Sequence, residues 1–196
     1  YGRTEVATTV VADPTDPTKG TIQFPANSST NVVDGRAIGN LPNHIHKTHM
    51  GKLLAKKNYN YGGVLYNEVL FPQDLRNCTK CHDGAATSTA PTKQGDNWKN
   101  VPSRMACGGC HDGINFATGM GVTIADAAKG RTATTSFGSF AHGGQSQADD
   151  SLCATCHTPG NIDIVHLPIT PPNTRSALHV QGGRANSNSA SIASNT

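Results

Sequence analysis

The chain has 196 residues and a formal net charge of +3, and only 35% of its residues are hydrophobic and 5% aromatic. Its 21 glycines and 11 prolines interrupt most helical or strand periodicity, which predicts a largely irregular fold of one or two domains with little β-structure. No apolar run approaches the roughly 18 residues that span a membrane. No cluster of lysines and arginines interleaved with aromatic residues marks a nucleic-acid surface. The sequence thus predicts neither a transmembrane protein nor a nucleic-acid binder.

Residues 1–40 form the first predicted region, a loop-rich N-terminal segment without histidine or cysteine. Two short β-like runs, at 8–12 and 21–24, flank the turn-rich sequence DPTDPTKG. Asp-Pro and glycine are strong turn signals, so we expect one loose hairpin here.

Residues 41–57 (LPNHIHKTHMGKLLAKK) are the best helix candidate. Pro42 suits a first helical turn, and the lysines gather near the end, where the helix dipole favours positive charge. The segment also holds His44, His46 and His49. His46 and His49 are three residues apart and would point to the same side of a helix, offset by about one turn. They are either metal ligands or part of a solvated surface cluster.

The remaining segments are less regular. The aromatic residues of 58–77 (Tyr59, Tyr61, Tyr66 and Phe71) are expected to pack against a prosthetic group. Residues 83–106 read as a polar loop, and a short helix is expected near 124–129. Residues 173–196 are of low complexity and predict a linker-like tail.

All six cysteines fall into three copies of one pentapeptide, C-x-x-C-H. The motif attaches c-type haem, because its two thiols reach the two vinyl groups of a porphyrin and its histidine ligates the iron. The copies are CTKCH (Cys78, Cys81, His82), CGGCH (Cys107, Cys110, His111) and CATCH (Cys153, Cys156, His157). The sequence therefore predicts three covalently bound haem c groups, with His82, His111 and His157 as proximal ligands.

Other chemistry explains the motifs less well. A zinc site gathers two such pairs around one ion, a thioredoxin-like pair is single, and a disulfide framework needs no histidine after every second cysteine. The haems also offer apolar surface that the chain can wrap, in place of the missing aliphatic core. The predicted fold class is a multihaem cytochrome c, mostly irregular with a few short helices around stacked haems, and residues 41–172 are the predicted trihaem domain.

The sixth ligand of each iron decides what the haems do. Six histidines remain outside the motifs: His44, His46, His49, His142, His166 and His179. This surplus over three irons favours bis-histidine ligation, which gives low-potential haems suited to electron transfer. Methionine ligands or an open site are the alternatives.

Several segments of the chain resemble the OmcA/MtrC family of outer-surface multihaem cytochromes from metal-reducing bacteria. The segments are HKTHMG (46–51), FPQDLRNCTKCHDG (71–84), ACGGCHDGINFATG (106–119), HGG (142–144), CATCHTP (153–159) and VHLPITPPN (165–173). They appear in the family's order, and the likeness covers most of the chain from about residue 20 onward.

The resemblance implies a pentahaem-type domain of bis-histidine haems, of which this chain carries the later three. By that resemblance, the distal ligands are His46, His49, His142 and His166. Four distal candidates exceed three irons, so one histidine is expected to serve a haem elsewhere in a larger polypeptide or in a neighbouring subunit. The chain is then either a piece of a longer cytochrome or a complete trihaem protein.

The leading functional hypothesis is extracellular electron transfer to metal oxides, flavins or another cytochrome. Haem attachment to C-x-x-C-H takes place after export, so an extracellular or outer-membrane-surface location is expected, with the haems attached in the periplasm. A subunit of a conducting filament, in which a histidine ligates a neighbour's haem, is one alternative. A multihaem reductase with an open haem site is another, and the sequence leaves enzymatic metal reduction open.

Overall fold

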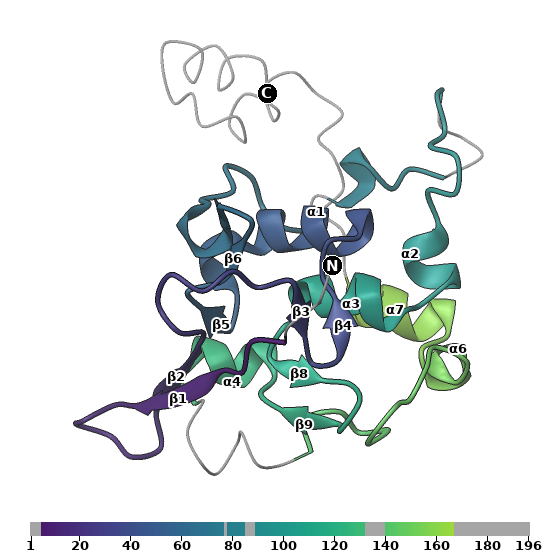
Figure 1. Cartoon of the computed structure of the whole chain (residues 1–196). Coiled ribbons are helices and arrows are strands. Elements are labelled where there is room, and N and C mark those ends of the chain that lie inside the picture. Colours follow the sequence, from purple (N-terminus) through teal and green to yellow (C-terminus); the bar gives the residue numbers. More distant parts are fainter. Residues whose placement is uncertain (1–4, 77, 85–88, 132–139, 167–196) are drawn as a thin grey trace, which may run out of the picture. The chain divides into compact units, whose positions relative to one another are not determined.

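The computed structural model describes residues 5–76, 78–84, 89–131 and 140–166 (Figure 1). The chain divides into two compact units, one made of Tyr1–Phe71 with Pro102–Cys156 and the other of Pro72–Val101 with His157–Thr196. Most of the described chain is irregular, with short helices and small sheets, which confirms the general expectation from composition. The described residues contain no helix with the length and apolarity of a membrane span. The predicted tail 173–196 and His179 lie outside the described residues.

The predicted N-terminal hairpin is confirmed in the first unit. Strand β1 (Thr9–Ala12) pairs antiparallel with β2 (Gly20–Gln23), and β5 (Lys56–Lys57) adds to β2 in parallel. The repeated Asp-Pro-Thr of the connecting turn closes on itself, because Asp16 Oδ1 accepts hydrogen bonds from the Thr18 amide (2.9 Å) and hydroxyl (2.7 Å). These bonds, the hydroxyl bond first, lower the pKa of Asp16 to about 2.

This unit also contains three two-stranded antiparallel ribbons among the described residues. Two of them turn through residues with positive φ, as tight hairpins require: Asp34 and Gly35 (50° and 73°), and Gly62 and Gly63 (55° and 94°). The ribbons are β3 (Val32–Val33) with β4 (Arg36–Ala37), β6 (Asn60–Tyr61) with β7 (Val64–Leu65), and β8 (Ile114–Asn115) with β9 (Met120–Gly121).

Helix α1 (Leu41–Met50) confirms the predicted histidine-bearing helix but is shorter than 41–57. Its N-cap is Asn40, whose side chain accepts a hydrogen bond from the Asn43 amide at 2.9 Å. It ends at Gly51, which has a φ of 50°. A Cβ at Gly51 would collide with the Val69 carbonyl oxygen, so the position requires glycine, and the chain continues as the 3-10 turn η1 (Gly51–Leu53).

Two of the four aromatic residues expected to pack against a prosthetic group, Tyr59 and Tyr66, instead lie in the protein core. Tyr59 and Tyr66 are fully buried and meet edge to face at 5.4 Å between ring centroids, and Phe24 meets Tyr59 at 4.7 Å. Burial raises the pKa of both phenols, that of Tyr66 to about 12. The expectation was wrong for these two tyrosines because their rings are already covered by protein. Tyr66 begins the 3-10 turn η2 (Tyr66–Glu68).

The end of the expected polar loop is helical. Helix α3 (Arg104–Cys110) starts within 83–106 and is capped by the Ser103 hydroxyl, which accepts from the Ala106 amide at 3.2 Å. The expected helix near 124–129 is confirmed as α4 (Ile124–Ala128), capped in the same way by Thr123. The last helix of this unit in the described ranges is α6 (Cys153–Cys156).

The second unit, described over parts of 72–101 and over 157–166, contains short helices. They are η3 (Cys78–Lys80), α2 (Asn97–Asn100) and α7 (Pro159–Val165). Lys99 of α2 lies 3.8 Å from Asp163 of α7, and the Thr158 hydroxyl caps the start of α7. An ion pair at the surface therefore joins the two α-helices of this unit.

Candidate haem-binding sites

Each C-x-x-C-H motif occupies a single helical turn. In the first two motifs the histidine amide donates to the carbonyl of the first cysteine, at 2.9 Å for His82 to Cys78 and 2.8 Å for His111 to Cys107. The third pair is the short helix α6. Because residues three apart share a face of a helix, this conformation turns the two sulfur atoms of a pair to the same side. Two thiols on one side of a turn suit attachment to one porphyrin edge.

The first cysteine of each pair lacks the lowered pKa of a catalytic dithiol. All six are free thiols, none of them in a disulfide. Burial raises the pKa of the first cysteine of each pair, Cys78, Cys107 and Cys153. Catalytic dithiols instead have a lowered pKa, because the thiolate is the reactive form. Among the described residues, no three or more His, Cys, Asp or Glu side chains gather as a metal cluster.

The second motif, CGGCH, is pressed against the histidine-bearing helix. A Cβ at Gly109 would lie 2.6 Å from the His46 Cβ, and one at Gly108 would lie 2.9 Å from the Arg36 guanidinium. Only glycine allows α1 and α3 to approach this closely (Figure 1). The two variable positions of this motif are therefore constrained by packing, and His46 is brought against the turn that carries the second pair of thiols.

Lys47 reinforces this contact and was not identified from the sequence. Its side chain is 2% exposed, and Nζ donates to the Gly108 carbonyl at 2.9 Å. Nζ also lies 4.7 Å from the centroid of the Tyr59 ring. Burial lowers the pKa of this ammonium to about 8. The buried face of α1 consists of Asn43, Lys47 and Met50, which is too polar for a hydrophobic pattern to reveal.

Asp112 fixes the chain directly after the second motif, and it too was missed. Its carboxylate is 4% exposed and accepts the backbone N–H groups of Ala55 and Lys56, each at 2.9 Å. The sequence feature that could have identified it is the repeated H-D-G, which directly follows both the first and the second cysteine pair. His111 is thus held between a helix and an anchored carboxylate.

Arg104 links the second motif to the third. Its Nε donates to Asp150 Oδ1 at 2.7 Å, and its Nη1 donates to the carbonyls of Gln147 (3.0 Å) and Ala148 (2.7 Å). These bonds hold the segment before α6 against the start of α3. The thiols of Cys107 and Cys153 are close enough that charge on Cys153 contributes to the raised pKa of Cys107, after the larger effect of burial. Two cysteine pairs are therefore neighbours within the first unit.

The first unit also contains three of the four predicted distal ligands. The His49 ring stacks on Phe71 at 4.5 Å between centroids, and burial lowers its pKa, which favours the neutral imidazole that a metal requires. The His142 Nδ1 lies 2.9 Å from the Gln145 carbonyl oxygen and so carries the proton. Iron-ligating histidines commonly donate one ring N–H to a carbonyl in this way, which leaves the lone pair on Nε2. His46, described above, is the third.

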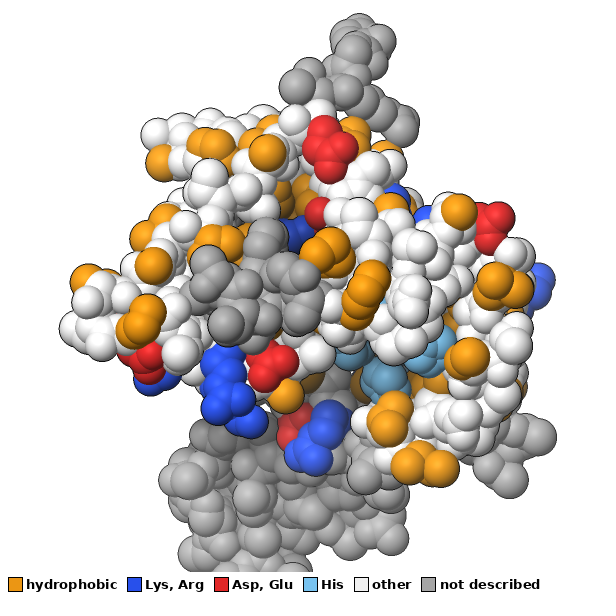
Figure 2. Space-filling model, turned by 90° about the horizontal axis from the view of Figure 1, so that it is seen from below, with side chains coloured by type: hydrophobic (Ala, Val, Ile, Leu, Met, Phe, Trp, Pro, Cys, Tyr) orange, Lys and Arg blue, Asp and Glu red, His pale blue; other side chains and the backbone are white. Residues whose placement is uncertain are grey.

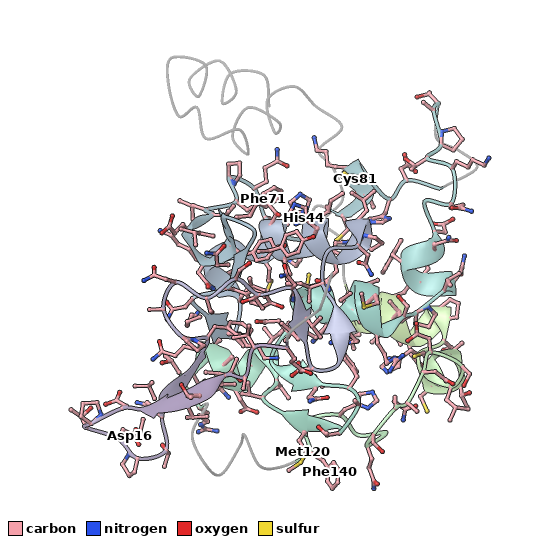
Figure 3. All side chains as sticks on the ribbon, in the orientation of Figure 1. Asp16, His44, Phe71, Cys81, Met120 and Phe140 are labelled. Carbon is pink, nitrogen blue, oxygen red and sulfur yellow. The ribbon has the colours of Figure 1, made fainter. Side chains whose placement is uncertain are left out.

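His166, the fourth predicted distal ligand, ends α7 in the second unit. Its Nδ1 lies 3.3 Å from the Ile162 carbonyl oxygen, so it shares the tautomer of His142. His44 differs, because its Nδ1 is hydrogen-bonded at 2.7 Å to the hydroxyl of the buried Tyr66. This bond ties His44, which is labelled on α1 in Figure 3, to the buried core.

The residues present fit c-type haem. Paired free thiols lie on one turn with a histidine directly after them, and further histidines hold the tautomer of an iron ligand. The first unit brings together Cys107, Cys110 and His111, the pair Cys153 and Cys156, and the histidines 46, 49 and 142, whereas the second unit holds Cys78, Cys81, His82, His157 and His166. Figure 2 shows histidine side chains at the surface beside hydrophobic ones.

Comparison with known proteins agrees with this chemistry. None of the curated proteins matches the chain. The crystal structure of MtrC from Shewanella baltica OS185 is similar at 19% identity with a TM-score of 0.33, over 75% of this chain and 24% of that one. The chain thus spans about a quarter of the length of that protein. Residues 20–167 match the family described as "Outer membrane cytochrome MtrC/MtrF-like, domains II/IV". The chain belongs to this family of outer membrane cytochromes, as its resemblance to OmcA/MtrC predicted.

Proposed function

We propose that this chain is an electron-transfer domain that holds three haem c groups with histidine on both sides of each iron. The observation that carries the proposal is the repeated geometry of the motifs, in which two free thiols on one helical turn are followed directly by a histidine. Membership of a cytochrome family implies multihaem electron transfer in general. The number of haems and the ligands are specific to this proposal.

The residues have separable roles. The six cysteines form the thioether bonds, and His82, His111 and His157 are the proximal ligands. His46, His49, His142 and His166 are the candidate distal ligands. When bound, the haem irons supply reversible one-electron transfer. The protein fixes the attachment points, and Arg104 keeps the second and third cysteine pairs adjacent, which suits transfer between neighbouring groups.

The proposed setting is the outer surface of the cell, as the name of the family suggests. Electrons would arrive from other cytochromes or from further haems of the same polypeptide, and would leave to metal oxides, flavins or another cytochrome. Four distal candidates for three motifs favour a histidine that serves a haem outside these motifs. Such a haem would belong either to a longer chain or to a neighbouring copy in a filament.

Ligand binding separates electron transfer from the alternative of a reductase. If both axial positions of every iron are filled by histidine, the reduced holoprotein should keep a six-coordinate low-spin spectrum when carbon monoxide is added. Rapid uptake of carbon monoxide by one haem would favour an enzyme with an open site. His142→Ala is the positive control, because removal of a distal ligand should create such a site.

A further inference from the structure

Lys47 is a buried cation that the attachment and ligation of haem do not explain. It lies between His46 and His49 in the sequence, on the face of α1 that packs against α3, and its side chain is 2% exposed. Burying an ammonium is unfavourable unless the surroundings compensate for its lost hydration. A hydrophobic residue would fill this position more simply, so the charge itself calls for an explanation.

The surroundings of Lys47 hold the ammonium without neutralising it. Nζ donates to the Gly108 carbonyl at 2.9 Å and faces the Tyr59 ring at 4.7 Å from its centroid. Lys47 forms no ion pair with any carboxylate in the part of the chain that the structure describes. The nearby Asp112 directs its two oxygens to the backbone amides of Ala55 and Lys56. A localised positive charge therefore sits on the carbonyl between Cys107 and Cys110.

The second motif alone has the backbone that this contact requires. Its two inner residues are glycines, and a Cβ at Gly109 would collide with the His46 Cβ at 2.6 Å. The inner residues of the first motif are Thr79 and Lys80, and those of the third are Ala154 and Thr155. The close contact of α1 is thus specific to the second of the three attachment turns.

We propose that Lys47 is a positioning residue of the second haem site, and that it also raises the reduction potential of the haem attached there. Its hydrogen bond fixes the histidine-bearing helix on the attachment turn. Its charge stabilises the reduced form, because reduction adds a negative charge close to the ammonium. The inference rests on the proposed function in one respect, namely that Cys107 and Cys110 bind a haem.

The test compares holoprotein carrying Lys47→Met, Lys47→Gln or Lys47→Arg with the unchanged holoprotein, all at pH 6. Intact mass first counts the covalent haems of each variant. Spectroelectrochemical titration, with the haem methyl resonances followed by NMR, then gives the oxidised-to-reduced ratio of each haem at a fixed potential. Lys56→Met is the matched control, because the Lys56 side chain is also buried (3% exposed) but its ammonium is paired with the Asp34 carboxylate at 2.5 Å.

We expect Met and Gln at position 47 to increase the oxidised-to-reduced ratio of the second haem about tenfold, a fall of about 59 mV for a one-electron couple. With Arg at position 47, the ratio should stay within about threefold of its value in the unchanged protein. The Lys56→Met control should leave the ratios of all three haems unchanged. Equal ratios in the Met, Gln and unchanged proteins would overturn the proposal. If Met prevents haem loading, the comparison of Gln with Arg decides the same question. In the unchanged protein, a peptide containing Cys107 and Cys110 that carries no haem would instead refute the proposed function.

Discussion

Substitution of Gly109 by alanine tests the close approach of α1 and α3. The added Cβ would lie 2.6 Å from the His46 Cβ and 3.4 Å from the Asn43 carbonyl oxygen, both on α1. Forcing an extra methyl group into a packed contact costs about 1–3 kcal/mol, whereas alanine is favoured over glycine in a helix by up to about 1 kcal/mol. The clash should outweigh the helix preference and leave a net loss of up to about 2 kcal/mol in the free energy of unfolding.

Thermal unfolding of the holoprotein, followed by far-UV circular dichroism, measures this effect. A loss of 1 kcal/mol lowers the Tm of a domain of this size by about 2–4 °C, so we expect Gly109→Ala to lower it by up to about 8 °C. Gly160→Ala is the matched control, because a Cβ at Gly160 of α7 meets nothing within 4 Å. It should leave the Tm unchanged or raise it slightly.

The absorption spectrum shows whether Gly109→Ala also disturbs His46, a proposed distal ligand. If α1 is pushed away from α3, the His46 ring moves with it, and we expect the reduced Gly109→Ala protein to bind some carbon monoxide. A Gly109→Ala protein as stable as the Gly160→Ala control, with an unaltered spectrum, would refute the reasoning on helix packing.

Three further changes test other contacts. Asp112→Asn should lower the free energy of unfolding by about 1.5–3 kcal/mol, measured by urea denaturation, because the amide cannot accept both backbone hydrogen bonds. Thr18→Val should raise the pKa of Asp16 from about 2 toward 3.8 in an NMR titration; any stability that Asp16 contributes is present above pH 3.8 and is lost as the pH falls through 2. Arg104→Met should speed hydrogen exchange of the amides at 151–153, and unchanged exchange would show that the Arg104 bonds to Asp150 and its neighbours are dispensable.

The parts of the structure that local sequence determines were predictable. The hairpin of β1 and β2 follows from two β-like runs around Asp-Pro turns, and α4 follows from a short run after a capping threonine. The three attachment turns follow from the spacing of cysteine and histidine. The family assignment rests on the same motifs in order, and the match over 20–167 confirms it.

Features set by contacts distant in the sequence were not predictable. The helix α1 ends at Met50, before Gly51, and Gly51 is required there because a side chain would meet the Val69 carbonyl, eighteen residues further on. Lys47 and Asp112 are charged residues, which a sequence pattern assigns to the surface, and only the fold shows that they are buried. Tyr59 and Tyr66 precede the first motif in sequence but pack against each other, and Tyr59 also packs against Phe24 of the N-terminal region. Hydrophobic periodicity cannot reveal such contacts, since the partners are separated by many residues.

The distal ligands are an intermediate case. Counting histidines identifies a surplus, but it does not distinguish His44 from its neighbours on the same helix. The structure adds the hydrogen bond between the His44 ring and the Tyr66 hydroxyl, and the hydrogen bonds that His142 and His166 donate to backbone carbonyls. These tautomers support the proposed assignment, which remains a prediction until each histidine is replaced in turn.

The intact mass of the natively purified, denatured protein tests the central claim most directly, because thioether-bound haem survives denaturation. We predict that this polypeptide carries one haem for each of its three C-x-x-C-H motifs. Tryptic peptides containing each cysteine pair should all bear the haem mass. A polypeptide whose C-x-x-C-H peptides carry no haem would contradict the account.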